Sequence, residues 1–91
     1  MKAANMPDAS AARGPLTISR QGDLACSVFD EQGRHVGNLK LINAVWKFKA
    51  IGYDEHSRIV PGGGPLTYRH NTLFASLNID DINAGLLHKS P

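Results

Sequence analysis

The sequence lacks several features that mark specialised classes of protein. Its single cysteine, Cys26, excludes an intramolecular disulfide and a cysteine-rich metal site. No stretch approaches the roughly 18 apolar residues that a membrane helix needs. The first residues, MKAANMPDASAARG, have no apolar run of the kind found in a signal peptide. Together these absences predict a cytoplasmic protein in a reducing compartment.

Charge and histidine spacing are equally uninformative about ligands. The net charge is +2, from ten Lys and Arg against eight Asp and Glu, which is too mild to indicate a nucleic-acid binder by itself. The four histidines are scattered, without the close spacing of a metal-binding pair. We therefore expect no metal site and no cofactor. Adjacent Asp80 and Asp81 suit the start of a helix better than paired acid–base chemistry.

The 91 residues allow one small domain. Residues 1–14 are rich in Ala, Ser, Asp, Asn and Pro and have no hydrophobic periodicity, which predicts a disordered tail. The expected domain is 15–91, and we find no internal repeat. It begins with a short edge strand at residues 16–20.

Alternating residues predict a β-meander from residue 24 to residue 53. A two-residue turn at Asn43-Ala44 would place Lys40 opposite Lys47. A one-residue slip would mix polar and apolar faces, which supports this register. We expect a four-residue loop, 30–33, that sets Phe29 opposite Arg34. The resulting inner face contains Leu24, Cys26, Val28, Leu39, Leu41, Trp46 and Phe48.

The C-terminal third predicts helices that cover this inner face. A turn at 54–57 leads to a short strand at 58–60, which Pro61 ends. Apolar spacing predicts one helix over 66–77 and a second from about Ile79, with Asn78 as its N-cap. The expected fold class is α+β: an antiparallel β-meander of three to five strands with one or two C-terminal helices packed on one face.

The stretch PGGGPLTYRHN, residues 61–71, permits two interpretations. Convergent backbone N–H groups of Gly62, Gly63 and Gly64, helped by Arg69 and His70, could bind an anion or form an enzyme's phosphate site. However, the stretch has neither the Lys-Ser/Thr of a P-loop nor a G-x-G-x-x-G pattern. We therefore favour a conformational connector.

The outer face of the predicted sheet combines basic, aromatic and apolar residues. The expected interaction face comprises Phe29, Arg34, Val36, Lys40, Lys47, Lys49, Ile51 and Tyr53. Phe29, Arg34 and Tyr53 would form one cross-strand row. Such a face suits single-stranded nucleic acid, a protein partner, or plain solvation. Its apolar members favour a protein contact, self-association included.

The stretch GNLKLINAVWKFKAIGYD, Gly37 to Asp54, resembles the last hairpin of tellurium-resistance stress proteins of the TerD type. The match lies in a Gly-x-Leu segment and the run Trp-Lys-Phe-Lys-Ala-Ile-Gly at 46–52. The resemblance implies a bacterial, cytoplasmic protein and supports the hairpin. That family is a larger β-sandwich whose acidic loops bind calcium, and those loops have no counterpart here.

The sequence thus favours a small, non-enzymatic binding or assembly module that acts through the outer sheet face, with a homodimer as one form. Binding of single-stranded nucleic acid on that face is one alternative. An anion-binding or enzymatic site at Gly62–Gly64 is the other. No membrane partner is expected.

Overall fold

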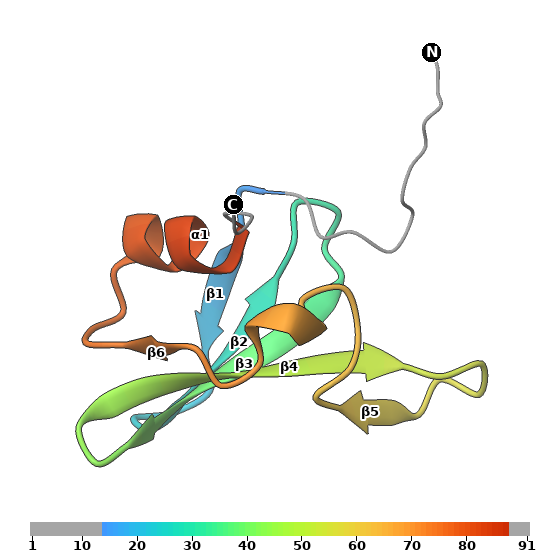
Figure 1. Cartoon of the computed structure of the whole chain (residues 1–91), viewed down its shortest axis with the longest axis horizontal. Coiled ribbons are helices and arrows are strands. Elements are labelled where there is room, and N and C mark those ends of the chain that lie inside the picture. Colours follow the sequence, from blue (N-terminus) through green and yellow to red (C-terminus); the bar gives the residue numbers. More distant parts are fainter. Residues whose placement is uncertain (1–13, 88–91) are drawn as a thin grey trace.

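The structure, a computed structural model, describes residues 14–87 and consists of a sheet covered by one helix (Figure 1). The strands follow the order β1-β2-β3-β4-β5, all antiparallel, and β6 also pairs with β4. This confirms the α+β meander. The expected disordered tail falls almost wholly on residues 1–13, outside the described residues. The elements are β1 (Thr17–Arg20), β2 (Ala25–Phe29), β3 (His35–Ile42), β4 (Val45–Tyr53), β5 (Ile59–Pro61), the 3₁₀ turn η1 (Thr67–Arg69), β6 (Leu73–Phe74) and α1 (Ile79–Leu87).

The central hairpin, β3 and β4, has the predicted register. Lys40 lies opposite Lys47, and Ile42 lies opposite Val45 across the turn. Asn43 and Ala44 take positive φ angles of 52° and 67°. Two consecutive left-handed residues form the turn whose twist matches that of antiparallel strands.

The connection between β2 and β3 differs from the prediction. The N–H of Asp30 donates to the carbonyl of Arg34, and Phe29 lies opposite His35 instead of Arg34. The register shifts at Val28/Phe29, where β3 carries one extra residue as a β-bulge. Up to the bulge the shift is two residues, an even number, so Cys26 still faces the core as predicted.

The predicted helix over 66–77 is wrong. The structure has the short turn η1 there, followed by β6. Asn71 takes a left-handed φ of 74°, which ends any helical path. Its N–H donates to the carbonyl of Phe48, and the N–H of Phe48 donates to the carbonyl of Thr72. These bonds satisfy the edge of β4, which outweighs the helix-like spacing of the leucines.

The second predicted helix is confirmed as α1. The Asn78 side chain accepts a hydrogen bond from the N–H of Asp81, as an N-cap does. Ile82 and Leu86 are buried against the sheet. Asn83 ties the helix to the residue before β1, because its side chain accepts from the N–H of Leu16 at 2.6 Å and donates to the Leu16 carbonyl at 3.3 Å.

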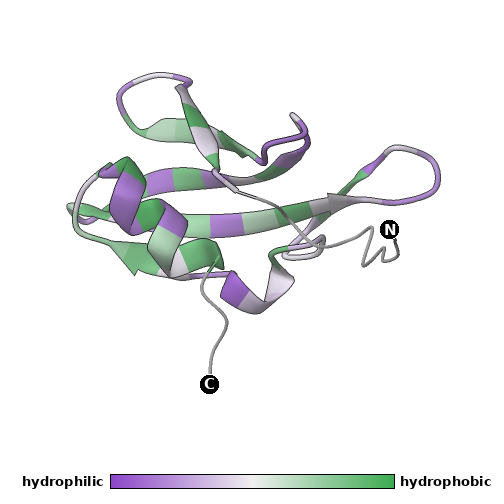
Figure 2. Ribbon diagram, turned by 90° about the horizontal axis from the view of Figure 1, so that it is seen from above, coloured by the Kyte–Doolittle hydropathy of each residue, from purple (hydrophilic) through white to green (hydrophobic). Residues whose placement is uncertain are grey.

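The core lies between α1 and one face of the sheet. Hydrophobic and hydrophilic residues alternate along the strands (Figure 2). Leu24 was predicted to face this core but is 63% exposed, because it precedes the first residue of β2. The other predicted inner residues are buried or pack at the edge of the core. The buried core consists of Leu16, Cys26, Val28, Val36, Leu39, Trp46, Phe48, Ala50, Leu66, Phe74, Ile82 and Leu86.

The opposite face of the sheet has no described helix over it (Figure 1). We call this the outer face, and α1 and η1 lie on the other side. Its side chains alternate with the core residues along the three central strands. They include Ala25, Ser27, Asn38, Lys40, Ile42, Val45, Lys47 and Lys49.

Candidate functional site

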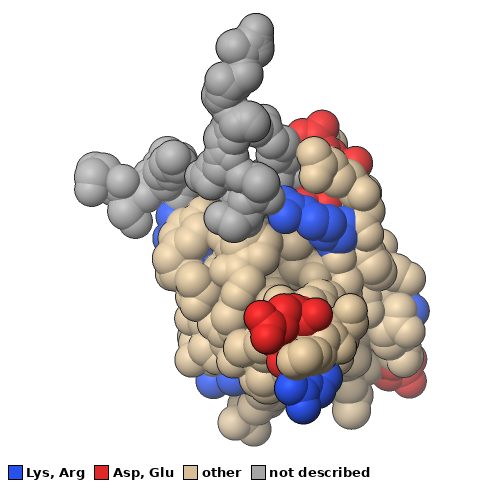
Figure 3. All heavy atoms as spheres, turned by 90° about the vertical axis from the view of Figure 1, so that its right-hand side faces the viewer, with Lys and Arg blue, Asp and Glu red and all other residues tan. Residues whose placement is uncertain are grey.

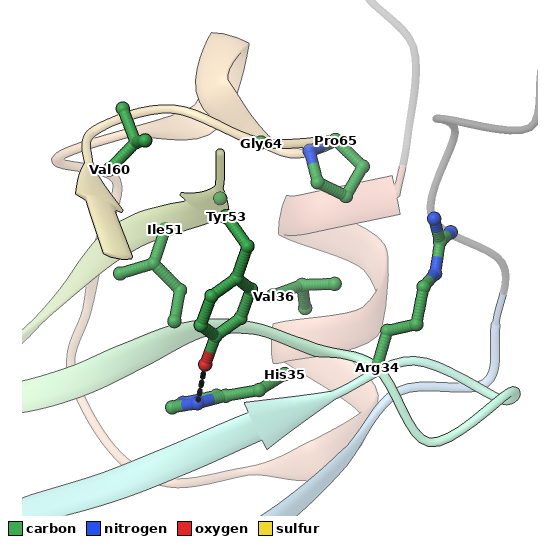
Figure 4. A pocket seen from close by; sticks show the side chains of 9 residues that line it. Arg34, His35, Val36, Ile51, Tyr53, Val60, Gly64 and Pro65 are labelled. Atoms are coloured by element: carbon green, nitrogen blue, oxygen red, sulfur yellow. Dashed lines mark hydrogen bonds between the residues drawn. The ribbon is translucent and has the colours of Figure 1, made fainter. Parts of the chain in front are cut away.

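A cavity opens where β3 and β4 part. Their pairing ends at Gly37 opposite Ala50. Beyond this point β3 stays beside β2, while β4 continues with β5. The gap holds about 600 Å³, within the range of ligand pockets. We call it the fork cavity, and it is lined by Arg34, His35, Val36, Ile51, Gly52, Tyr53, Val60, Gly64 and Pro65 (Figure 4).

The cavity walls are mainly apolar. Val36 and Ile51 were predicted to lie exposed on the outer face, but both are buried, Val36 to 1% and Ile51 to 6% exposure. Both line the fork, where the bulge bends β3, and Val36 also joins the core cluster. Val60 of β5 and Pro65 of the loop after β5 close another side (Figure 4). The two apolar residues therefore shape a recess, not a flat patch.

A hydrogen-bonded group lies on one side of the fork. The Tyr53 hydroxyl is 3.4 Å from His35 Nδ1, and His35 Nε2 is 2.9 Å from Asn38 Oδ1. The Phe29 and His35 rings contact at 5.1 Å between centroids. The predicted cross-strand row of Phe29, Arg34 and Tyr53 thus exists with His35 in place of Arg34. The exchange arises because the loop between Phe29 and His35, residues 30–34, is one residue longer than predicted.

Arg34 lies at the rim, and its charge is balanced. Its Nε donates to Asp30 Oδ2 at 2.6 Å, and the Asp30 side chain is fully buried. Burial alone would raise the pKa of Asp30, but hydrogen bonds from the Arg34 and Gln32 backbone N–H groups and from the Arg34 side chain lower it. The rim is therefore close to neutral. Charges of both signs also lie side by side at the end of the molecule seen in Figure 3.

Three lysines on the outer face form a cluster beside the fork. Lys40 lies directly opposite Lys47, and Asn38 lies opposite Lys49. The ion pairs among the described residues are Arg34–Asp30, His56–Glu55 and Arg58–Asp54, so none of them involves these lysines. Lys49 Nζ donates to the neutral Asn71 Oδ1 at 2.7 Å. The cluster, Lys40, Lys47 and Lys49, is thus a positive patch that forms no ion pair with a carboxylate of residues 14–87.

The glycine loop is bound into the fold. The N–H of Gly62 donates to the carbonyl of Ala50 at 2.7 Å, and the N–H of Gly63 donates to that of Val60 at 3.1 Å. Gly64 lies so close to β4 that a Cβ would collide with the Ile51 carbonyl. These contacts use two of the amides that an anion site would need. They fit the connector interpretation.

The side chains proposed for the anion site are also engaged. His70 Nδ1 accepts a hydrogen bond from the N–H of Ala50 at 3.1 Å. The Arg69 guanidinium carbon lies 5.2 Å from the centre of the Tyr68 ring. Cys26 is buried in the core, and burial raises the pKa of its thiol. A thiol held in its protonated form is a poor nucleophile.

Within residues 14–87, no group of three or more His, Cys, Asp and Glu side chains could hold a metal ion. No helix in that part of the chain is long and apolar enough to cross a membrane. Comparisons with protein-family models, curated proteins and solved structures gave no match. The resemblance of residues 37–54 to TerD-type proteins therefore stays an expectation from the sequence.

Sequence reasoning found part of this site. It identified Arg34, Val36, Ile51, Tyr53 and the lysine cluster, and separately the glycine loop. The structure brings the first four together with Gly64 in one cavity. Sequence reasoning missed His35, Asn38, Val60 and Pro65. The first two depend on the register at the end of β2 and β3, and the last two depend on the path of β5 and the loop after it beside the fork. The isolated Gly37, where pairing with β4 ends, was a signal of irregular backbone.

Proposed function

We propose that this chain is a non-enzymatic binding or assembly module that contacts another protein, a second copy included, through its outer face and the fork cavity. The observation that carries the proposal is the lysine cluster, which pairs with none of the described carboxylates, beside an apolar recess. Like charges directly opposite one another destabilise a sheet. A local cost of this kind is common where a surface serves a partner. The single buried thiol fits a cytoplasmic module, and the TerD-type resemblance would make it bacterial.

Binding of single-stranded nucleic acid is the less favoured candidate on this face. Such sites interleave cations with exposed aromatic rings on which bases stack. Here the lysines and the aromatic residues are segregated along the strands. Phe29 and His35 contact each other, and Tyr53, 50% exposed, is held by His35. One accessible ring offers a short stacking platform.

The proposal is tested by photo-crosslinking in cells that make the protein. A photoreactive amino acid is placed at position 25 or 42 on the outer face, and in matched controls at position 80 or 84 on the exposed side of α1. We expect discrete protein adducts, a dimer of the chain included, from positions 25 and 42 only. Equal labelling from both sides, adducts with nucleic acid alone, or no adducts would each overturn the proposal.

A further inference from the structure

The outer face of β4 carries an ordered series of side chains. Lys47, Lys49, Ile51 and Tyr53 alternate along one strand, so successive members lie roughly 7 Å apart. The first two are cations, the third forms a wall of the fork cavity, and the fourth stands at its rim. Lys40 broadens the cationic part from the neighbouring strand. The strand therefore presents charge and an apolar recess in a fixed order and at a fixed spacing.

The two parts of this series differ in electrostatics. Within the described part of the chain the lysine cluster has no carboxylate partner, whereas the fork is close to neutral because Asp30 balances Arg34. Lys49 is already held by Asn71, a neutral acceptor that leaves its charge uncompensated. By charge complementarity, the anionic groups of a partner should therefore lie at the lysine end. The apolar walls assign an uncharged hydrophobic group to the fork.

We propose that the outer face binds an extended acidic segment of a partner protein, anchored by one apolar side chain in the fork cavity. This inference rests on the proposed function and specifies its partner. In an extended chain every second side chain points the same way. An anchor beside Ile51 therefore places the side chains two and four positions away near Lys49 and Lys47. The recognised pattern is an apolar residue, a spacer, an acid, a spacer and an acid, in one chain direction or the other.

A protein segment fits this surface better than a polyanion of uniform charge. A nucleic acid would leave the apolar part of the fork without a partner, because its phosphates recur along the whole backbone. A second copy of the chain would have to present an extended acidic stretch. Asp80 and Asp81, a candidate pair, lie at the start of α1 in helical geometry. A separate acidic segment meets both requirements.

The test uses fluorescently labelled synthetic peptides and the full chain. Two probes carry the pattern in opposite directions: Leu-Ser-Asp-Ser-Asp and Asp-Ser-Asp-Ser-Leu, each flanked by Gly-Ser. Matched controls replace Leu by Ser, or both Asp by Asn. A labelled oligothymidine of similar length is the nucleic-acid probe. We expect one peptide direction to bind at micromolar to millimolar concentration, and each control peptide to bind at least about fivefold more weakly.

Variants of the protein locate the binding site. Lys47→Gln should weaken binding about two- to fivefold, as expected for one exposed charge pair. Arg20→Gln, the same charge change on a residue that stacks over Trp46, should leave binding unchanged. Val60→Ser at the cavity rim should weaken binding, while Leu24→Ser at a more exposed apolar position should not. Urea unfolding of each variant separates lost binding from lost fold.

Several outcomes would overturn the inference. They are equal binding of the Leu-lacking peptide, no effect of Lys47→Gln, tighter binding of the oligothymidine than of either peptide, or no binding of any peptide. If these occur while crosslinks still form at positions 25 and 42, the proposed function stands and the partner has a different chemistry. If crosslinks are also absent, both fail.

Discussion

Two loops of this molecule have the same construction but different surroundings. The loop between β2 and β3 reads Asp30-Glu31-Gln32-Gly33-Arg34, and the loop between β4 and β5 reads Asp54-Glu55-His56-Ser57-Arg58. In each, the Asp N–H donates to the Arg carbonyl, and the fourth residue donates back to the Asp carbonyl. In each, Asp Oδ1 accepts from the N–H groups two and four residues later. The local sequence determines the shape of both.

The loops differ in burial. The Asp30 side chain is fully buried and 2.6 Å from Arg34 Nε, whereas the Asp54 side chain is 33% exposed and 3.3 Å from Arg58 Nε. The first loop closes the strand end beside the fork cavity, and the second is the tip of a projecting ribbon (Figure 1). Water can replace lost hydrogen bonds at the tip but not at Asp30. The same motif should therefore stabilise the fold unequally.

Removing the two aspartates should give the largest difference. Asp30→Ala leaves the Arg34 guanidinium and two loop amides without their buried acceptor, so we expect a loss of about 2–4 kcal/mol in the free energy of unfolding. Asp54→Ala, the matched control, should lose clearly less. Urea unfolding followed by Trp46 fluorescence measures both. Equal losses would show that burial does not separate the loops.

Acidification should reproduce part of this difference. Burial opposes ionisation of Asp30, but its hydrogen bonds and Arg34 leave its pKa lowered, and the Arg58 backbone N–H is the main cause of the lowered pKa of Asp54. A lowered folded-state pKa contributes stability that is complete above the ordinary carboxyl pKa, about 4, and is lost as pH falls through the folded value. Asp30→Asn should flatten the pH dependence of the unfolding free energy below pH 4 more than Asp54→Asn does. The reverse order would contradict the comparison.

Exchanging the left-handed residues should have the smallest effect. Gly33 and Ser57 occupy equivalent positions with φ of 82° and 63°. A Cβ at Gly33 would meet no atom within 4 Å, so Gly33→Ser should cost only backbone energy, roughly 1 kcal/mol. Ser57→Gly should gain up to about the same amount. Thermal unfolding of both variants measures the pair, and a gain from Gly33→Ser would refute the shared geometry.

The sequence predicted the parts of the fold that local pattern controls. Alternation and the Asn43-Ala44 turn gave the β3–β4 register, and Asn78 marked the start of α1. The helix predicted over 66–77 is wrong because hydrogen bonds to the edge of β4 outweigh the helix-like leucine spacing. That edge is apparent only in the assembled sheet. The predicted pairing of Phe29 with Arg34 failed because the loop has five residues instead of four, and the bulge beyond Phe29 adds one more residue to β3; neither has a clear local signal.

The candidate site was predictable only in pieces. Lys40, Lys47 and Lys49 follow directly from the hairpin register. Val36 and Ile51 were assigned to the correct strands, but their burial was not predicted. The prediction assumed a flat sheet where β3 and β4 in fact part. The recurrence of Asp-Glu-x-x-Arg is visible in the sequence, but only the hydrogen bonds of the structure show that the two loops share one geometry. From sequence alone, the two copies of so short a motif look like unrelated turns.

The bonds between Asn83 and Leu16 have a consequence for how this unit can be attached to other chains. They bring the first and last described segments together on the helix side of the sheet (Figure 1). A short linker could join these segments, and new ends opened within the 54–58 tip should be tolerated in a circular permutant. By the same geometry, a tag attached directly before residue 14 or directly after residue 87 would start on the helix side of the sheet, opposite the outer face. Immobilisation through such a tag would leave the lysine cluster and the fork open to solution.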